Sequence, residues 1–323
     1  MRVDIHSHAL INIALFHKNL VRKRKPPKFW NPLRNQIDIP RLMEADIRGV
    51  SFTIYTLPRF LPVKKHFQQA QKQIQLFHEL IIQTKGAYEI ALNGKELARI
   101  LKQGKRAAFL SMEGAHSLER QIPRIEYFKR QGLFYITLTH FVPNGIANPC
   151  HTSVFTKQGI TPLGKMLLRS MEKYSVLPDT AHLSDKAYAD FIRSYNGPIL
   201  CTHTGARKFH NIERNIPDWV LDEIKKRDGL VGVIAYPLYL VGKLRASTLA
   251  MAETAAYFAD KIGVEKVAIG TDFDGYIFGP TDMRDITGWQ NLENSLQKVG
   301  FHTKEIEQIT GKNAVNFFAK YVM

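Results

Sequence analysis

The sequence predicts an α/β fold, a single (β/α)8 barrel of the TIM type that spans residues 1–323. Eight runs rich in β-branched and apolar residues recur along the chain, and helix-length segments separate most of them. The chain has 323 residues, of which 45% are apolar, so it can bury a large core and lies within the size range of one such barrel. Strands that alternate with helices form parallel sheets joined by crossover helices. We therefore expect the functional site at the C-terminal ends of the strands, where barrels of this type build their active sites.

The expected strands are spread evenly, four in each half of the chain. They cover residues 3–8, 50–57, 107–112, 133–140, 176–182, 199–203, 230–236 and 267–272. Apolar residues with helical spacing lie between them, and we expect two of these stripes to face the core. The stripes consist of Phe67, Ala70, Ile74, Phe77 and Ile81, and of Leu163, Met166, Leu167, Met171 and Tyr174. Ser184 is expected to cap the next helix, and Gly263 is expected to end the helix that carries Ala252 and Ala255.

The composition predicts a cytoplasmic protein without a membrane anchor. Polar residues interrupt the apolar N-terminal segment, no cleavage site follows it, and no window approaches the roughly 20 apolar residues of a spanning helix. The two cysteines, Cys150 and Cys201, fit a reducing compartment, and we expect Cys201 to pack in the interior.

The chain is basic, with 45 Lys and Arg against 29 Asp and Glu and a formal net charge of +16. Such a charge attracts anions in general. The densest basic run, residues 18–28, contains two prolines and is expected to be a solvated loop. No nucleic-acid recognition motif accompanies the charge, so we expect no specific nucleic-acid partner. A homodimer is compatible with the sequence, although no segment marks an interface.

Histidines and acidic residues gather at the ends of the expected strands. His6 and His8 are two residues apart on the first strand, so their side chains should share one face. The later strands end in Glu113, His140, His182, His203 and Asp272. Imidazole and carboxylate are ligands that Zn²⁺, Mn²⁺ and Co²⁺ take in catalytic sites, and one bridging carboxylate can hold two such ions close together. The expectation for six other histidines is an ordinary core or surface position: His17, His66, His78, His151, His210 and His302.

Six short motifs along almost the whole chain resemble the membrane (renal) dipeptidase family of the amidohydrolase superfamily, in the order that family has them. The motifs are LSMEGAHSLE (residues 110–119), LTH (138–140), DTAH (179–182), CTHTGAR (201–207), RNIPD (214–218) and GTDFDG (270–275). The resemblance implies a barrel that holds two divalent ions, most simply Zn²⁺, and cleaves dipeptides.

By motif position, the resemblance implies two groups of ligands that share one carboxylate. One ion would be held by His6, His8, Glu113 and Asp272, and the other by His182, His203 and the same Glu113. His140 would bind the substrate and polarise its carbonyl group, and Arg214 would hold its free carboxylate. The family has aspartate where this chain has His8, which leaves one negative charge fewer around the first ion and makes that ion a stronger Lewis acid.

These residues predict a zinc-dependent dipeptidase that attacks the peptide bond with a metal-bridging hydroxide. Glu113 would bridge the two ions, and Asp272 would accept the proton of the attacking water and pass it to the leaving amine. His140 would stabilise the oxyanion of the tetrahedral intermediate.

Two other classes remain open at this stage. One is a metal-dependent hydrolase of a lactone, another amide or a phosphoester, because the segment DIHSH (residues 4–8) also resembles the start of the polymerase-and-histidinol-phosphatase class. Membership in that class would leave the motifs around Glu113 and Asp272 without an explanation. The other is a non-catalytic basic binding protein, whose signature would be binding that weakens steeply with salt.

Overall fold

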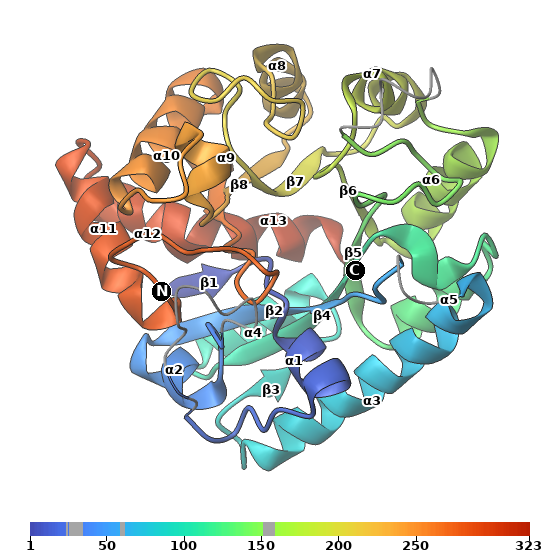
Figure 1. Cartoon of the computed structure of the whole chain (residues 1–323), viewed down its shortest axis with the longest axis horizontal. Coiled ribbons are helices and arrows are strands. Elements are labelled where there is room, and N and C mark those ends of the chain that lie inside the picture. Colours follow the sequence, from blue (N-terminus) through green and yellow to red (C-terminus); the bar gives the residue numbers. More distant parts are fainter. Residues whose placement is uncertain (24, 26–34, 59–61, 151–158) are drawn as a thin grey trace.

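A computed structural model describes residues 1–23, 25, 35–58, 62–150 and 159–323 of the chain. These residues form a nearly closed barrel of eight parallel strands with helices around it (Figure 1), which confirms the predicted fold class. In their order around the barrel, the strands are β1 (Arg2–Asp4), β2 (Ile47–Ile54), β4 (Ala107–Glu113), β5 (Leu133–Thr137), β6 (Leu177–Asp179), β7 (Leu200–Thr204), β8 (Leu230–Val233) and β9 (Val267–Ile269). A two-residue strand that the sequence analysis missed, β3 (Glu89–Ile90), pairs with β4 outside this order.

Most of the strands end earlier than predicted. The first strand stops at Asp4 rather than at residue 8, and the last stops at Ile269 rather than at residue 272. The prediction was wrong at these ends because the chain leaves the ladder there and keeps only isolated backbone pairing, such as the bridge between Ser7 and Phe273. The residues beyond each strand form the rim of the barrel, where side chains are free to turn inward.

The described helices range from one turn to five turns in length. They are α1 (Ala9–Phe16), α2 (Ile39–Glu44), α3 (His66–Gln83), α4 (Gly94–Lys102), α5 (Arg124–Arg130), α6 (Pro162–Tyr174), α7 (Asp185–Ser194), α8 (Asp218–Lys226), α9 (Pro237–Val241), α10 (Leu249–Ile262), α11 (Trp289–Lys298), α12 (Thr303–Glu307) and α13 (Asn313–Tyr321).

The predicted helix ends are confirmed, and one predicted core residue is wrong. Ser184 accepts a hydrogen bond from the amide of Ala187 at the start of α7, and Gly263, with a φ of 97°, follows α10. Met166 of α6 is 50% exposed, because it lies one residue off the face on which Leu167 and Met171 are buried.

The barrel closes through the segments that follow β1 and β9. The amide of Ile5 donates to the carbonyl of Ile269 at 3.0 Å, and the amide of Asp272 donates to the carbonyl of His6 at 2.9 Å. The amide of His8 completes the series by donating to the carbonyl of Phe273 at 2.8 Å. The closure of the barrel therefore places the segments after the first and the last strand side by side, together with the candidate ligands His6, His8 and Asp272.

Aromatic side chains fill the opposite end of the barrel, which α13 crosses (Figure 1). Phe318 of α13 packs its ring 5.5 Å from that of Phe109 and 5.4 Å from that of Phe134. The hydrophobic effect stabilises this closed end. Only the end at the carboxyl termini of the strands is left for polar side chains and a ligand.

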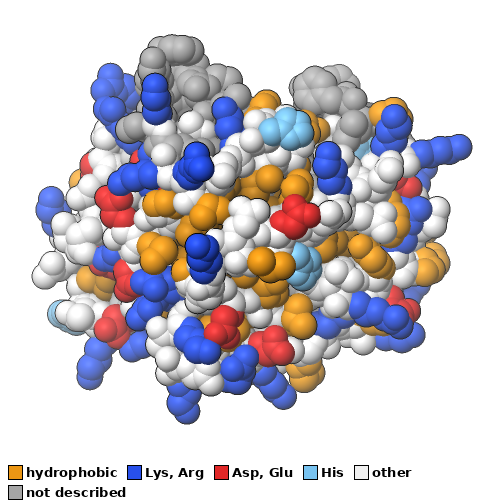
Figure 2. Space-filling model, turned by 90° about the horizontal axis from the view of Figure 1, so that it is seen from below, with side chains coloured by type: hydrophobic (Ala, Val, Ile, Leu, Met, Phe, Trp, Pro, Cys, Tyr) orange, Lys and Arg blue, Asp and Glu red, His pale blue; other side chains and the backbone are white. Residues whose placement is uncertain are grey.

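Two predictions about the surface can be compared with the structure. No helix in the described part of the chain has the length and apolar composition needed to span a membrane. On the face shown in Figure 2, lysine and arginine side chains are scattered among acidic and apolar ones. Residues 24 and 26–28 of the basic run and residues 151–158, which include His151, lie outside the described residues. The expectation of a solvated loop at residues 18–28 and that of an ordinary position for His151 therefore stay predictions.

Candidate metal centre

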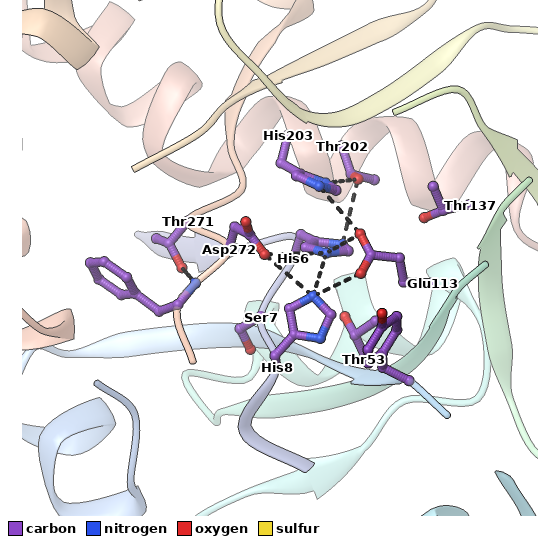
Figure 3. Close-up of polar contacts among 12 residues, drawn as sticks. His6, Ser7, His8, Thr53, Glu113, Thr137, Thr202, His203, Thr271 and Asp272 are labelled. Atoms are coloured by element: carbon purple, nitrogen blue, oxygen red, sulfur yellow. Dashed lines mark hydrogen bonds and ion pairs between the residues drawn. The ribbon is translucent and has the colours of Figure 1, made fainter. Parts of the chain in front are cut away.

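Glu113, the last residue of β4, lies at the centre of a buried cluster at the open end of the barrel. Its carboxylate is within 3.5 Å of five imidazole nitrogens, all of them Nε2 atoms. They belong to His6, His8, His140, His182 and His203. Figure 3 shows His6, His8, His203 and Asp272 turned toward this carboxylate. The structure thus brings together all of the predicted ligand residues.

The first group consists of His6, His8 and Asp272 on one side of Glu113. The Nε2 atoms of the two histidines are 3.2 Å apart, and His8 Nε2 is 3.3 Å from Oδ1 of Asp272 and 3.1 Å from Oε2 of Glu113. The prediction that His6 and His8 share a face because they lie on one regular strand was wrong in its reason, since β1 ends at Asp4. Their side chains converge in the irregular segment after it.

The second group consists of His182 and His203 on the other side of the carboxylate. Their Nε2 atoms are 3.1 Å apart and lie 3.2 and 3.3 Å from Oε1 of Glu113. Four donors around one ion at about 2.0–2.1 Å are separated by about 3.3 Å in tetrahedral geometry, which matches these spacings. Glu113 thus presents Oε2 to His8 of the first group and Oε1 to both members of the second.

Hydroxyl groups below the cluster orient two of the imidazoles. Tyr135 donates its hydroxyl hydrogen to the carbonyl of Ile5, so its oxygen accepts from Nδ1 of His6 at 2.9 Å. Thr202 donates to Asp179 in the same way and accepts from Nδ1 of His203 at 2.9 Å. With hydrogen on Nδ1, each ring directs the lone pair of Nε2 into the cluster, as a metal ligand requires.

Asp179 supports the cluster without being a ligand. Its Oδ1 accepts from the amides of Ala181 and Thr202, and its Oδ2 accepts from the hydroxyls of Thr137 and Thr202. Because its oxygens are occupied by hydrogen bonds, Asp179 anchors β5, β6 and β7 to one another beneath His203.

Two candidate ligands adopt a left-handed backbone conformation that few non-glycine residues use. His182 has a φ of 69° and Asp272 a φ of 60°. Backbone hydrogen bonds hold both, from the amide of Cys150 to the carbonyl of His182 and from the amide of Gly275 to the carbonyl of Asp272. A Cβ atom at Gly275 would lie 2.4 Å from Oδ1 of Asp272, so glycine is required there.

The loop after Glu113 explains the EGAHSL motif. Gly114 has a φ of 75°, and a Cβ atom there would lie 2.7 Å from Nδ1 of His116. The buried ring of His116 donates from Nε2 to the carbonyl of Val142 at 3.0 Å. Burial lowers its pKa to about 4, so the ring is neutral. Glycine and histidine thus shape the turn that directs Glu113 inward.

The charges of the centre favour a bound cation. Burial by itself lowers the pKa of His8, but the carboxylates of Glu113 and Asp272 more than offset burial and raise it to about 10. Oε1 of Glu113 is buried without a hydrogen bond among the described residues, although histidine nitrogens surround it. Four imidazoles and two carboxylates whose donor atoms converge in this way fit divalent transition-metal ions.

His140 lies beside the two groups at the edge of a cavity. Its Nδ1 is 2.9 Å from the hydroxyl of Tyr55, and burial lowers the pKa of the imidazole to about 4. The ring is therefore neutral near pH 7. A hydrogen bond donated by Tyr55 to Nδ1 leaves the hydrogen on Nε2, which lies 3.5 Å from Oε2 of Glu113.

Arg214 is 3% exposed and lies behind His182 and Tyr239 rather than in the cavity wall. Its Nη2 donates to the carbonyl of His203 at 3.0 Å and approaches Nε2 of His182 at 3.3 Å, while Nε and Nη1 have no hydrogen-bond partner among the described residues. Asp218, four residues further along the chain, pairs with Lys261 and not with Arg214. A buried guanidinium with two unsatisfied N–H groups fits a bound anion.

A cavity of about 620 Å³ opens over the centre. Its floor consists of centre residues, namely His8, Glu113, His140, His182 and Asp272. Phe141, Tyr236, Tyr239 and Tyr276, which follow strand ends, contribute aromatic rings to its lining.

Several supporting residues were not identified from sequence. The residues that orient histidine rings contact them from other parts of the chain, namely Tyr55, Tyr135 and Thr202. No spacing of residues within the sequence could therefore predict their role. The expected interior packing of Cys201 is confirmed, since it is fully buried with its sulfur 3.7 Å from the hydroxyl of Tyr188. Cys150 is also buried. His66, for which we expected an ordinary core or surface position, is buried and forms a hydrogen bond between its Nδ1 and the hydroxyl of Thr56.

The chain is similar to known proteins along nearly its whole length. The model of the membrane dipeptidase family, peptidase family M19, matches residues 3–321. Dipeptidase tcpJ of Claviceps purpurea is 25% identical over 321 residues, which cover 97% of this chain and 75% of that protein. Dipeptidase aclJ of Aspergillus oryzae is 24% identical over 326 residues, which cover 97% of this chain and 76% of that protein.

Solved structures share the fold. The dipeptidase AC, a metallopeptidase of family M19, has a TM-score of 0.88 at 20% identity and covers 99% of this chain and 98% of its own. A metallopeptidase from Rhodobacter sphaeroides, solved with a phosphinate mimic of the dipeptide L-Ala-D-Ala, has a TM-score of 0.88 at 18% identity and covers 99% and 100%.

Proposed function

Because the chain belongs to the membrane dipeptidase family, a family of metallopeptidases, we propose that it hydrolyses the peptide bond of dipeptides with two zinc ions at the Glu113 centre. The observation that carries this proposal is the position of Glu113, whose Oε2 lies 3.1 Å from Nε2 of His8 and whose Oε1 lies within 3.5 Å of Nε2 of His6, His182 and His203. A carboxylate in that position is suited to bridge two ions.

We assign the ligands of the two ions by the position of the motifs that carry them. His6, His8, Asp272 and Glu113 would hold one ion, and His182, His203 and Glu113 the other, and the short distances within each set support this assignment. Bound zinc would supply a water of lowered pKa and would polarise the substrate carbonyl. In the structure, Nε2 of His182 lies 3.3 Å from Nη2 of Arg214. With an ion bound, the lone pair of this nitrogen would be directed to the ion.

The protein's own side chains would manage protons and orientation. Asp272 Oδ1, 3.3 Å from His8 Nε2 and exposed to the cavity, would accept a proton from the attacking water and return it to the leaving amine. His140 would donate from Nε2 to the carbonyl oxygen as negative charge develops there. Tyr55 would hold that ring in the required tautomer.

Arg214 would bind the substrate's free carboxylate through its unsatisfied N–H groups, so substitution by alanine should mainly weaken binding. We expect KM to rise at least about tenfold with a smaller change in kcat, since a hydrogen bond to a charged group contributes about 1.5–3 kcal/mol. The wild-type enzyme should also discriminate against dipeptide amides, which lack the carboxylate, whereas the variant should not. Arg193→Ala, an exposed arginine on α7, is the matched control. Unchanged KM together with retained discrimination would exclude this role.

The proposed function is tested by elemental analysis of the purified protein together with hydrolysis of a panel of L,L and L,D dipeptides. Two equivalents of zinc with release of amino acids are expected. Two equivalents without release would direct the search to lactones, other amides and phosphoesters. Failure to bind metal after zinc is resupplied would contradict the proposal altogether.

A further inference from the structure

The cavity above the metal centre has a polar floor and an apolar wall. The wall is formed by residues of α1, of the segment after β2 and of the turn after β9, among them Ile11, Leu57, Tyr276 and Ile277. Phe141 and Tyr236 continue this wall on the far side. A ligand whose scissile bond lies on the floor therefore places its side chains against apolar and aromatic surface.

Among the described residues, the lining contains no lysine or arginine, and its only carboxylates are those of Glu113 and Asp272. Both belong to the proposed metal centre and are not available to a substrate side chain. Arg214, which is outside this lining, would be occupied by the substrate's free carboxylate. A charged substrate side chain would therefore lose its hydration in this cavity without gaining an oppositely charged partner among the lining residues, which is costly.

The size of the cavity points in the same direction. Its 620 Å³ correspond to the liquid volume of about 20 water molecules, which is in the middle of the range of pockets that enclose drug-sized ligands. A dipeptide of two small residues would leave much of that space to water. Large apolar side chains would displace the water and gain the hydrophobic contribution of burial.

We propose that this site selects dipeptides with large, uncharged apolar side chains, and that Tyr276 is one of the residues that determine the selection. This inference rests on the proposed function, since it names the substrate class of the same site. Apolar contacts of this kind discriminate by size, by about 10–200-fold for each methylene group that a pocket accepts or lacks.

Tyr276 is held at the cavity by the same turn that carries Asp272. Asp274, between them, accepts hydrogen bonds from the amides of Gln36 and Ile37 at 2.8 and 3.2 Å, which ties the turn to the chain before α2. Tyr276 has a φ of 64° and is 39% exposed. Asparagine adopts a positive φ more readily than tyrosine, so Tyr276→Asn removes the aromatic ring while keeping the backbone conformation.

The first experiment measures kcat/KM of the zinc-loaded enzyme for Leu-Leu, Phe-Leu, Ala-Ala, Glu-Glu and Lys-Lys. We expect Leu-Leu and Phe-Leu to exceed Ala-Ala at least about tenfold, and the two charged dipeptides to fall below Ala-Ala. Equal values for Leu-Leu and Ala-Ala, or efficient cleavage of a charged dipeptide, would overturn the inference while leaving the proposed function intact.

The second experiment compares Tyr276→Asn with Leu244→Asn, which makes the same change at a residue that is 47% exposed and not among the lining residues. The ratio of kcat/KM for Leu-Leu to that for Ala-Ala should fall at least about fivefold in Tyr276→Asn and stay at the wild-type value in Leu244→Asn. Thermal unfolding and zinc content should be unchanged in both variants. An unchanged ratio in Tyr276→Asn would exclude this residue as a determinant.

Titration calorimetry with the same dipeptides separates the two proposals. If no dipeptide is hydrolysed but Leu-Leu binds at least about tenfold more tightly than Ala-Ala, the proposed function fails and the pocket's selectivity stands. If neither hydrolysis nor preferential binding is observed, both are overturned.

Discussion

Replacing Glu113 with glutamine is expected to remove almost all activity and to release both zinc ions. The carboxylate lies 3.2 and 3.3 Å from the histidines of one ligand group and 3.1 Å from His8 of the other, so both groups lose their shared anion at once. Glutamine keeps the shape but not the charge. We expect kcat to fall at least about 10³-fold, since the chemistry that depends on both ions is lost.

Elemental analysis and steady-state kinetics on the same preparation test this result. Glu126→Gln removes a carboxylate from α5 on the protein surface, where Glu126 pairs with Arg130, and should match the wild type in both measurements. Full zinc content in Glu113→Gln, or activity within tenfold of the wild type, would contradict a bridging role.

Replacing His182 with alanine should produce a different pattern, with one zinc ion lost and one kept. His182 contacts Oε1 of Glu113 and Nε2 of His203 but belongs only to the second ligand group. The first group retains His6, His8, Asp272 and Glu113, enough for tetrahedral coordination. We expect a stoichiometry near one and a loss of kcat of at least about 10³-fold, because one ion alone lacks the paired centre on which attack depends.

The matched control is His78→Ala, a histidine on α3 away from the centre, which should keep two ions and full activity. Zinc competition with a coloured chelator would show whether the remaining ion in His182→Ala is bound as tightly as in the wild type. A fully active His182→Ala variant, or one that loses both ions, would rule out two ligand groups that share only Glu113.

Much of the candidate centre could be predicted from sequence because parallel strands impose a simple geometry. Each crossover returns the chain in the same direction, so the residues at or just beyond the carboxyl ends of β1, β4, β6, β7 and β9 meet at one end of the barrel however far apart they lie in sequence. Histidines and carboxylates at those positions were enough to identify His6, Glu113, His182 and Asp272 as neighbours.

Prediction failed where contacts between elements decide the outcome. The strand ends were placed too late, since the point at which a strand leaves the ladder depends on pairing with its neighbours. Met166 was assigned to the core, although the rotation of α6 against the barrel leaves it half exposed. The apolar wall around Tyr276 is assembled from separate segments, and no local pattern marks it.

By itself, the sequence determined the order of strands and helices, the end of the barrel that carries the chemistry, and the residue types available there. Periodicity and strand-end composition are local properties, and the handedness of crossovers extends them to the whole fold. Only the tertiary structure decided which oxygen of Glu113 faces which histidines, which hydroxyls of Tyr135 and Thr202 orient the rings, and how wide the cavity above them is. These depend on distances of about 3 Å between groups far apart in the chain, and such distances arise only when the barrel closes.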